Sequence, residues 1–195
     1  MRHHDAGQRG TRAQRVGDAA RDATKANTVR PDAFVAPVRG ALGVADPEGV
    51  VWHRLPARAP RFDLANVREL PRVDVVYSYV GADGAAVDAL VAAGARGLVV
   101  AGVGRGGMPP AQREALTRAV AKGVVVVAGS RTGAGSVPVG RGSRRAAGAA
   151  PDAPEVPSAI GAGDLNPAKA RVLLMLALTR TNDPRQVARI FAEHQ

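Results

Sequence analysis

The stretch from Gly97 to Pro110 constrains the fold of this 195-residue chain more than any other part of the sequence. It contains a short continuous apolar run, Leu98 to Ala101, which is typical of a strand buried on both faces of a parallel sheet. A glycine-rich loop follows, and Pro109 suits the first turn of a helix that opens just after it. Because ligands of parallel α/β sheets bind beyond the carboxyl ends of strands, this loop is the first candidate for the rim of a site.

The glycines of this loop overlap only loosely with the dinucleotide-binding fingerprint. Gly102 and Gly104 have the right spacing, but the later glycines, Gly106 and Gly107, stand at the wrong offsets for a phosphate cradle. Pro109 also removes an amide donor that a phosphate would use. Nucleotide binding is therefore disfavoured, and a glycine-rich connection without a ligand of its own stays open as the alternative to a site rim.

Strands and helices alternate from Val73 onward. The apolar periods predict strands over 73–80, 98–101 and 124–128, and helices over 83–93 and 110–122. A further helix is expected to begin near Asn166 with Asp164 as its cap, and a last one at Asp183. The apolar face of the first of these consists of Val172, Leu173, Leu176, Ala177 and Leu178. Such alternation predicts βαβ crossovers and an α/β fold, a parallel sheet with helices on both faces.

The part of the chain before this alternation is expected to be less regular. Residues 1–17 show neither a helical nor a strand period and predict a disordered tail, in which the adjacent His3 and His4 are only a weak metal candidate. Residues 18–28 are predicted to form a loop. Two extended runs then flank Asp46-Pro47-Glu48-Gly49, a turn signal that predicts a β-hairpin. We therefore expect four segments: a tail over 1–17, a hairpin region over 18–61, a linker over 62–72 and the α/β domain over 73–195.

Two places in the chain carry residues with possible chemistry. Lys25 stands in the predicted loop, where a desolvated lysine can move protons or activate a nucleophile, although a plain surface lysine is the alternative. The segment 130–157 is rich in glycine, proline and arginine and is too long for an inert connection. Its acids, Asp152 and Glu155, are candidates for reaching into a site, and solvated loop charges are the alternative.

The composition excludes several classes of function. The net charge of +10 invites a nucleic-acid interpretation, but the arginines are scattered among small residues and aromatic stacking platforms are lacking, so no nucleic-acid partner is expected. The absence of cysteine excludes disulfides and thiolate metal sites. No run reaches the length of a membrane span and residues 1–17 lack a signal-peptide core, so we expect a cytoplasmic protein without a membrane partner.

Several motifs of the chain resemble those of the bacterial-type L-asparaginases, a family that includes the glutaminase-asparaginases. The run 21–28, Arg-Asp-Ala-Thr-Lys-Ala-Asn-Thr, is similar to the family's Arg-Asp-Val-Thr-Lys-Thr-Asn-Thr. Residues 70–77, Leu-Pro-Arg-Val-Asp-Val-Val-Tyr, the glycine loop, and residues 165–171, Leu-Asn-Pro-Ala-Lys-Ala-Arg, follow in the family's order at similar spacing. The resemblance covers the chain from about Asp18 to its C-terminus.

This resemblance implies a flavodoxin-like C-terminal domain, a homo-oligomer, and hydrolysis of L-asparagine, or in some members L-glutamine, without metal or organic cofactor. Lys25 matches the family's catalytic lysine. Gly107 stands where many members carry an asparagine that a neighbouring subunit's active site uses. Glu155 is the nearest candidate for the acidic residue that the family contributes across the same interface.

Two motifs of the family's N-terminal domain do not occur in this sequence: Gly-Gly-Thr-Ile, which carries the nucleophilic threonine, and His-Gly-Thr-Asp, whose Thr-Asp pair works with the lysine. Removing one member of a catalytic unit can cost about as much as removing all of them. We therefore expect a truncated asparaginase that is inactive alone, with residues 18–61 as a remnant of the first domain. A non-catalytic module that associates with itself or with a full-length asparaginase is the alternative. The preference between asparagine and glutamine stays open.

The same loss has a consequence for stability. A hairpin region without the sheet it packs on exposes strand edges and apolar side chains, and these favour aggregation or local disorder. We expect one or the other of these effects between Asp18 and Arg58.

Overall fold

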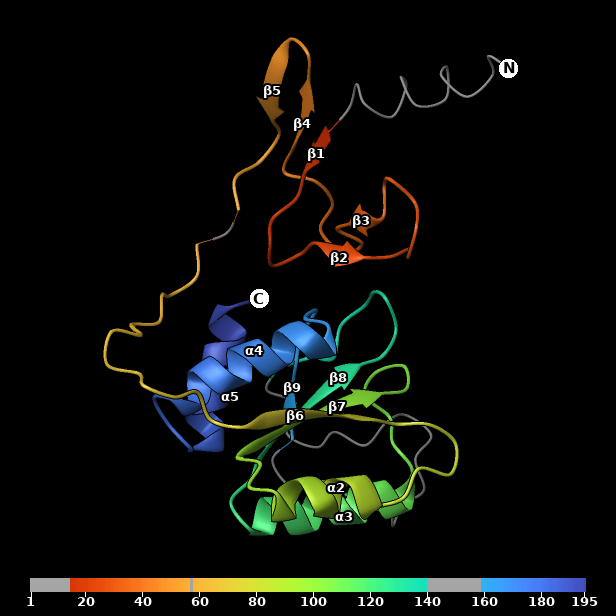
Figure 1. Ribbon diagram of the computed structural model, residues 1–195, viewed down its shortest axis with the longest axis vertical. Helices are drawn as coiled ribbons and strands as arrows, with labels where there is room; N and C mark the ends of the chain where they lie inside the picture. Colours follow the sequence, from red (N-terminus) through yellow and green to blue (C-terminus); the bar gives the residue numbers. More distant parts are fainter. Residues whose placement is uncertain (1–14, 57, 140–158) are drawn as a thin grey trace. The chain divides into compact units, whose positions relative to one another are not determined.

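The alternating strands and helices predicted after Val73 form a four-stranded parallel sheet (Figure 1). The computed structural model describes residues 15–56, 58–139 and 159–195. The chain divides into two compact units, Met1–Arg58 (unit 1) and Ala59–Gln195 (unit 2), and the sheet belongs to unit 2. No helix among the described residues is both long enough and apolar enough to span a membrane.

The strands of unit 2 lie in the order in which they occur along the chain. They are β6 (Val73–Tyr77), β7 (Gly97–Gly102), β8 (Val125–Ser130) and β9 (Ile160–Gly161). One row of apolar residues crosses the sheet in register, because Val75 lies opposite Val99, Val99 opposite Val127, and Val127 opposite Ile160. Parallel neighbours need crossover connections, and one helix between β6 and β7 and another between β7 and β8 supply two of them.

Helices cover both faces of this sheet. On one face lie α2 (Ala85–Ala92) and α3 (Pro110–Ala121), and on the other lie α4 (Pro167–Leu178) and α5 (Pro184–Glu193) (Figure 1). The predicted α/β fold, with a parallel sheet covered by helices on both faces, is confirmed. Its flavodoxin-like character stays a prediction.

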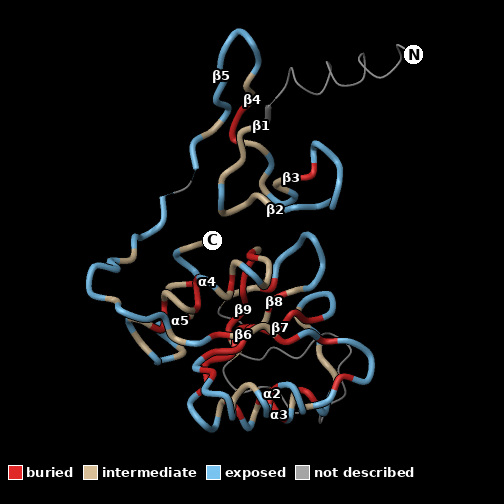
Figure 2. Tube along the Cα trace, in the orientation of Figure 1, coloured by how far each residue is buried: buried red, intermediate tan, exposed pale blue. Residues whose placement is uncertain are grey.

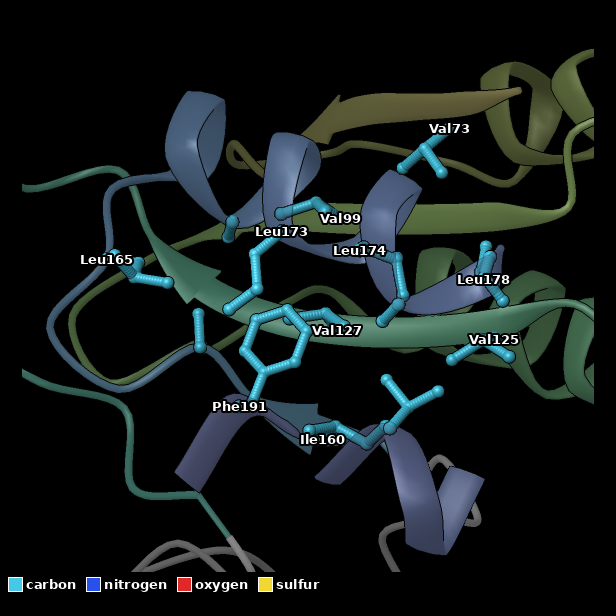
Figure 3. Packing of buried hydrophobic residues seen from close by; sticks show 14 residues of the cluster. Val73, Val99, Val125, Val127, Ile160, Leu165, Leu173, Leu174, Leu178 and Phe191 are labelled. Carbon is cyan, nitrogen blue, oxygen red and sulfur yellow. The ribbon is translucent and has the colours of Figure 1, made fainter. Parts of the chain in front are cut away.

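The sheet separates two apolar cores, and successive residues of β7 contribute to opposite ones because side chains alternate along a strand. Val99 joins the α4–α5 core, and its neighbours Leu98 and Val100 join the α2–α3 core. Figure 3 shows the Phe191 ring pointing from α5 toward Val127 of the sheet. The buried members of the α4–α5 core are Val73, Val99, Val125, Val127, Ile160, Ala162, Leu165, Ala170, Leu173, Leu174, Ala177, Leu178, Val187 and Phe191. Those of the α2–α3 core are Val76, Val87, Ala95, Leu98, Val100, Ala115, Leu116, Ala119, Val124 and Val126.

Glycine is required at the start of β7 by the close approach of α4. A Cβ built on Gly97 would lie 2.8 Å from Cδ2 of Leu174, which is closer than real Cβ contacts come. The leucine side chain occupies the space that any larger residue at position 97 would take. This contact lets α4 approach the sheet closely at this strand.

Unit 1 consists of two small antiparallel sheets. Strands β1 (Arg15–Gly17), β4 (Gly43–Asp46) and β5 (Gly49–Trp52) form one in the order β1-β4-β5, and β2 (Thr24–Lys25) pairs with β3 (Phe34–Val35) in the other. The Asp46 carboxylate closes the hairpin turn by accepting hydrogen bonds from the backbone N–H groups of Glu48 at 3.1 Å and Gly49 at 3.0 Å. The predicted hairpin is confirmed.

Two sequence predictions for unit 1 are wrong at their edges. Residues 15–17 were expected to belong to an irregular tail, but they form β1, in which Val16 pairs with Val44. Residues 18–28 were expected to be a loop, but Lys25 lies in a strand opposite Phe34. Both strands are defined by partners elsewhere in the chain, which a local period does not reveal.

Three details of unit 2 also differ from the prediction. The strand predicted over 73–80 ends at Tyr77. The cap of α4 is Asn166 rather than Asp164, because the Asn166 side chain accepts a hydrogen bond from the Lys169 N–H at 2.9 Å, three residues into the helix. Val172, which was expected on the apolar face of this helix, is 52% exposed. The buried residues of α4 lie three, four, seven and eight positions after Ala170, so position 172 falls on the other side of the helix.

Candidate functional site

The candidate catalytic lysine, Lys25, is an exposed residue of strand β2 in unit 1. Its neighbour Thr24 pairs with Val35, and the N–H of Ala26 donates to the Ala33 carbonyl at 2.6 Å, so backbone pairing fixes the chain on both sides of the lysine. Among the described residues the Lys25 ammonium group takes part in no ion pair. The local fold therefore presents the lysine to solvent with its charge available to a partner.

An Asx turn and an ion pair shape the loop that joins β2 to β3. The Asn27 side-chain oxygen accepts from the N–H groups of Val29 at 2.9 Å and Arg30 at 3.1 Å. Nε of Arg30 donates to Oδ1 of Asp32 at 2.9 Å. This hydrogen bond lowers the pKa of the Asp32 carboxyl and raises the pKa of Arg30. Because the pKa of the Asp32 carboxyl is lowered, the ion pair stabilises the loop at any pH above the usual pKa of a carboxyl group. This stabilisation is lost as the pH falls through the lowered pKa.

A nearly buried carboxylate ties the segment before Lys25 to a more distant turn. The Asp22 side chain is only 6% exposed and lies 2.8 Å from Nη1 of Arg21 and 3.7 Å from Nε of Arg39. Because two guanidinium groups flank it, Asp22 is a compensated charge within the unit. The match of residues 21–28 to the family therefore includes an acid whose visible role is structural.

The glycine loop after β7 folds back on itself. Val103 and Gly107 exchange two backbone hydrogen bonds, 2.8 Å from the Val103 N–H to the Gly107 carbonyl and 2.7 Å in the reverse direction. Gly104 and Gly106 have positive φ, and a Cβ on Gly102 would lie 2.6 Å from Gly106 Cα. Glycine at these positions permits a tight closed loop. The Gly107 amide is used inside the loop, which argues further against a phosphate cradle.

Hydroxyl side chains that the sequence did not single out lie next to this loop at the carboxyl edge of the sheet. The Arg131 N–H donates to the Gly102 carbonyl at 2.9 Å, which joins the ends of β7 and β8. Ser130 Oγ and Thr132 Oγ1 lie 2.7 Å apart, and the Thr132 hydroxyl donates to the Ala134 carbonyl at 2.9 Å. Their position just after a buried strand was the available signal, since that is where parallel sheets present polar groups to ligands.

A buried polar pair fixes the start of this edge. Ser78, which follows β6, and Gln112, in the first turn of α3, are both almost fully buried. Ser78 Oγ donates to Gln112 Oε1 at 2.6 Å, and Gln112 Nε2 donates to the Tyr77 carbonyl at 3.0 Å. The pair holds the helix that follows the glycine loop against the end of β6.

The three residues predicted for the site are distributed over the chain. Lys25 lies in unit 1 and Gly107 lies exposed in the glycine loop of unit 2, while Glu155, like Asp152, lies outside the described residues. Lys25 and Gly107 are each described only within their own unit. No group of three or more histidine, aspartate or glutamate side chains within 15–56, 58–139 and 159–195 comes together as a metal site.

Unit 2 is a parallel α/β unit with a closed glycine loop at the carboxyl edge of its sheet. Unit 1 precedes it in the sequence, is antiparallel and presents a lysine. The two together define a class of α/β proteins with a separate antiparallel part. A family model described as the glutaminase/asparaginase C-terminal domain matches residues 72–191. The chain belongs to this family.

Comparison with curated proteins gives the same family. The chain is 39% identical over 182 residues to L-asparaginase 2 of Escherichia coli (strain K12), an alignment that covers 89% of this chain and 49% of the relative. It is 36% identical over 179 residues to L-asparaginase 2 of Bacillus subtilis (strain 168), with 90% and 45% covered. For the glutaminase-asparaginase of Pseudomonas fluorescens biotype A the identity is 33% over 180 residues, with 90% and 47% covered. The chain spans about half the length of the curated relatives that it matches.

Proposed function

We propose that this chain is the C-terminal part of an amidohydrolase that converts L-asparagine or L-glutamine and water to the corresponding acid and ammonia. The observation that carries the proposal is the family match over residues 72–191, together with relatives named L-asparaginase and glutaminase-asparaginase. The reaction is hydrolysis of a side-chain amide, in which water supplies the oxygen of the new carboxylate and the nitrogen leaves as ammonia. By resemblance, Lys25 is the catalytic lysine, and Gly107 and Glu155 mark the places where subunits of a homo-oligomer complete one another's sites.

We also propose that the chain alone is catalytically incomplete. Neither Gly-Gly-Thr-Ile nor His-Gly-Thr-Asp occurs in its 195 residues, so the threonine nucleophile and the partners of the lysine would come from another segment. The exposed position of Lys25 in β2 is consistent with a lysine that meets these partners from outside its own sheet.

The test is ammonia release, measured for this chain alone and for a chimaera. In the chimaera, the part of the Bacillus subtilis relative that this chain does not match is fused in front of Asp18. We expect no ammonia above background from the chain alone, and release from the chimaera with asparagine or glutamine that is lost on Lys25→Ala. Lys122→Ala, at an exposed lysine that follows α3, is the matched control and should leave release unchanged.

Two results would contradict the proposal. Release by the chain alone that Lys25→Ala abolishes would show that the chain is complete. The second result is a chimaera that hydrolyses neither amide although its cooperative unfolding shows that it is folded. This result would contradict the proposed hydrolase activity.

A second candidate is a non-catalytic module that associates with itself or with a full-length asparaginase. It is favoured by the four residues of β5, all of which are exposed and three of which are large and apolar: Val50 at 56%, Val51 at 57% and Trp52 at 59%. Exposed apolar residues on an edge strand are typical of an interaction surface. Co-purification with an intact asparaginase would support this candidate, and a monodisperse monomer that binds no asparaginase would count against it.

A further inference from the structure

Hydrogen bonds outside the glycine loop join the two ends of that loop. The loop connects β7 to α3. At its first end, the Ala101 carbonyl of β7 accepts from the Ser78 N–H at 3.1 Å. At its second end, Gln112 in the first turn of α3 binds Ser78 and Tyr77 through its side chain. Both ends of the loop are therefore attached to one short segment at the end of β6.

The Tyr77 carbonyl determines how the Gln112 amide is oriented. A carbonyl oxygen only accepts hydrogen bonds, so the amide atom that lies 3.0 Å from it is Nε2. The other amide atom, Oε1, then faces Ser78 Oγ at 2.6 Å, and the serine hydroxyl is the donor. Ser78 is 0% and Gln112 1% exposed, so water does not compete for these bonds. The pair therefore has one arrangement of donors and acceptors.

The start of α3 differs from the starts of the two helices that follow it. In α4 and α5 the side chains of Asn166 and Asp183 cap the helix by accepting from its backbone N–H groups. The N-cap of α3 is Pro109, whose ring offers no acceptor, and Pro110 follows at the first helical position. Gln112 therefore fixes the start of α3 by contacts with the end of β6 in place of a cap.

The buried pair is better suited to fixing a position than to adding stability. A hydrogen bond contributes little net free energy to folding, because both partners form hydrogen bonds with water in the unfolded chain. Apolar side chains of similar shape at both positions would fill the same space at nearly the same stability. They would not fix the distance and angle between α3 and β6, as hydrogen bonds do.

We propose that Ser78 and Gln112 are positioning residues for the glycine loop, the candidate rim of the site. They fix the separation of the two ends of the loop, which keeps the Val103–Gly107 pair closed and gives the loop one conformation. Sites need such supporting hydrogen bonds, because a small displacement of a contacting group weakens what it binds. The consequence for hydrolysis rests on the proposed function, whereas the consequence for the loop does not.

Amide hydrogen exchange of the intact chain, resolved by residue with NMR, tests the loop. The N–H groups of Val103 and Gly107 report on it, because each donates to the other's carbonyl. In the double variant Ser78→Ala with Gln112→Met, we expect both amides to exchange about tenfold faster, since the loop opens more often without the pair. The Val127 amide, in the middle of β8, and the urea midpoint should stay nearly unchanged. Ser78→Ala alone should give a smaller increase at the same two amides, and it decides the test if the double variant does not fold.

Thr117→Val is the matched control on the same helix. It removes the hydrogen bond from Thr117 Oγ1 to the Arg113 carbonyl at 3.1 Å, which does not involve the loop or β6, and should leave loop exchange unchanged. Unchanged exchange of Val103 and Gly107 in the Ser78 and Gln112 variants would overturn the proposal. An equal increase in Thr117→Val, or an increase accompanied by a lower urea midpoint, would also overturn it, because either result indicates general loosening.

The chimaera of the proposed function tests the consequence for hydrolysis. The double variant should lower kcat/KM for asparagine or glutamine about tenfold, and Thr117→Val should leave it unchanged. Equal kcat/KM for the double variant and the unchanged chimaera would overturn the role of the pair in the site. If the unchanged chimaera hydrolyses neither amide, the proposed function fails, and the exchange experiment still decides whether the pair positions the loop.

Discussion

Two strands with similar apolar residues have opposite surroundings in this molecule. All six residues of β7, which include Val99 and Val100, are buried, whereas all four residues of β5, which include Val50 and Val51, are exposed (Figure 2). Strand β7 has β6 and β8 on its two sides and helices over both faces. Strand β5 pairs with β4 on one side only, at the edge of a three-stranded sheet.

The difference shows that apolar residues stabilise a unit only through the area that they remove from water. Burial of an apolar side chain contributes roughly 25 cal/mol per Å². The valines of β7 are buried on both faces of the sheet and contribute this free energy. The valines of β5 are exposed and contribute little of it. Unit 2 therefore holds its own core, and the stability of unit 1 depends on what covers its strands.

The largest expected difference between the two units is in amide hydrogen exchange. Amides of β7 should exchange at least about 1,000-fold more slowly than those of β5, because core strands open only with the whole unit and poorly packed strands open locally. Mass spectrometry of the native chain at several protein concentrations measures the ratio and controls for self-association. Strong protection across residues 18–58 at the lowest concentration would show that unit 1 is stable by itself.

Two phenylalanines at opposite extremes of burial sharpen the comparison. Phe191→Ala removes a ring with 0% exposure from the α4–α5 core and should lower the free energy of unfolding by about 4 kcal/mol. Phe34→Ala, at a ring that is 66% exposed in unit 1, should change it by no more than about 0.5 kcal/mol. Urea unfolding measures both variants. The helical circular-dichroism signal follows unit 2, where the helices of the described residues lie, and the fluorescence of Trp52, the one tryptophan of the sequence, follows unit 1. Similar losses for the two variants would contradict the difference between the units.

A pair of glycines gives a smaller effect. Gly97→Ala places a Cβ 2.8 Å from Leu174 Cδ2, so we expect a loss of about 2 kcal/mol as α4 shifts. Gly133→Ala meets no atom within 4 Å and should leave stability unchanged within about 0.5 kcal/mol. The same urea experiment compares the two variants. If Gly97→Ala is as stable as Gly133→Ala, α4 does not lie as close to β7 as described.

The smallest effect is expected at the cap of α4. Asn166→Ala removes the acceptor for the Lys169 N–H and should cost about 1 kcal/mol, whereas Asn166→Asp keeps an acceptor and should be nearly neutral. Thermal unfolding of the three chains under one buffer condition distinguishes them. Equal melting temperatures for Asn166→Ala and the unchanged chain would show that the cap contributes nothing measurable.

Much of the fold was predictable from local sequence. The run 98–101 and the alternation that follows Val73 predicted the parallel sheet and the helices on both of its faces, and Asp46 to Gly49 predicted the hairpin turn. Strands β1 and β2 were missed because they depend on partners that are distant in sequence, such as Arg15 with Ala45. Choosing Asn166 over Asp164 as the cap required the register of the helix start, since both side chains are suitable acceptors.

Less of the candidate site followed from physical reasoning. The carboxyl-edge rule indicated the glycine loop, but the roles of Lys25, Gly107 and Glu155 rest on family resemblance. The Ser78–Gln112 pair left no signal in the sequence, because a buried polar residue looks locally like any surface one. Its hydrogen bond joins positions 34 residues apart, and only the three-dimensional fold brings them together.

The two cores of unit 2 have a further consequence for synthesis of the chain. The buried members of the α2–α3 core all lie between Val76 and Val126, whereas those of the α4–α5 core extend from Val73 to Phe191. A ribosome that delivers the chain from its N-terminus therefore supplies one face of the sheet long before the other. Until α4 and then α5 leave the exit tunnel, the valines of the second face lack their cover, and nascent chains with exposed apolar strands are those that chaperones bind.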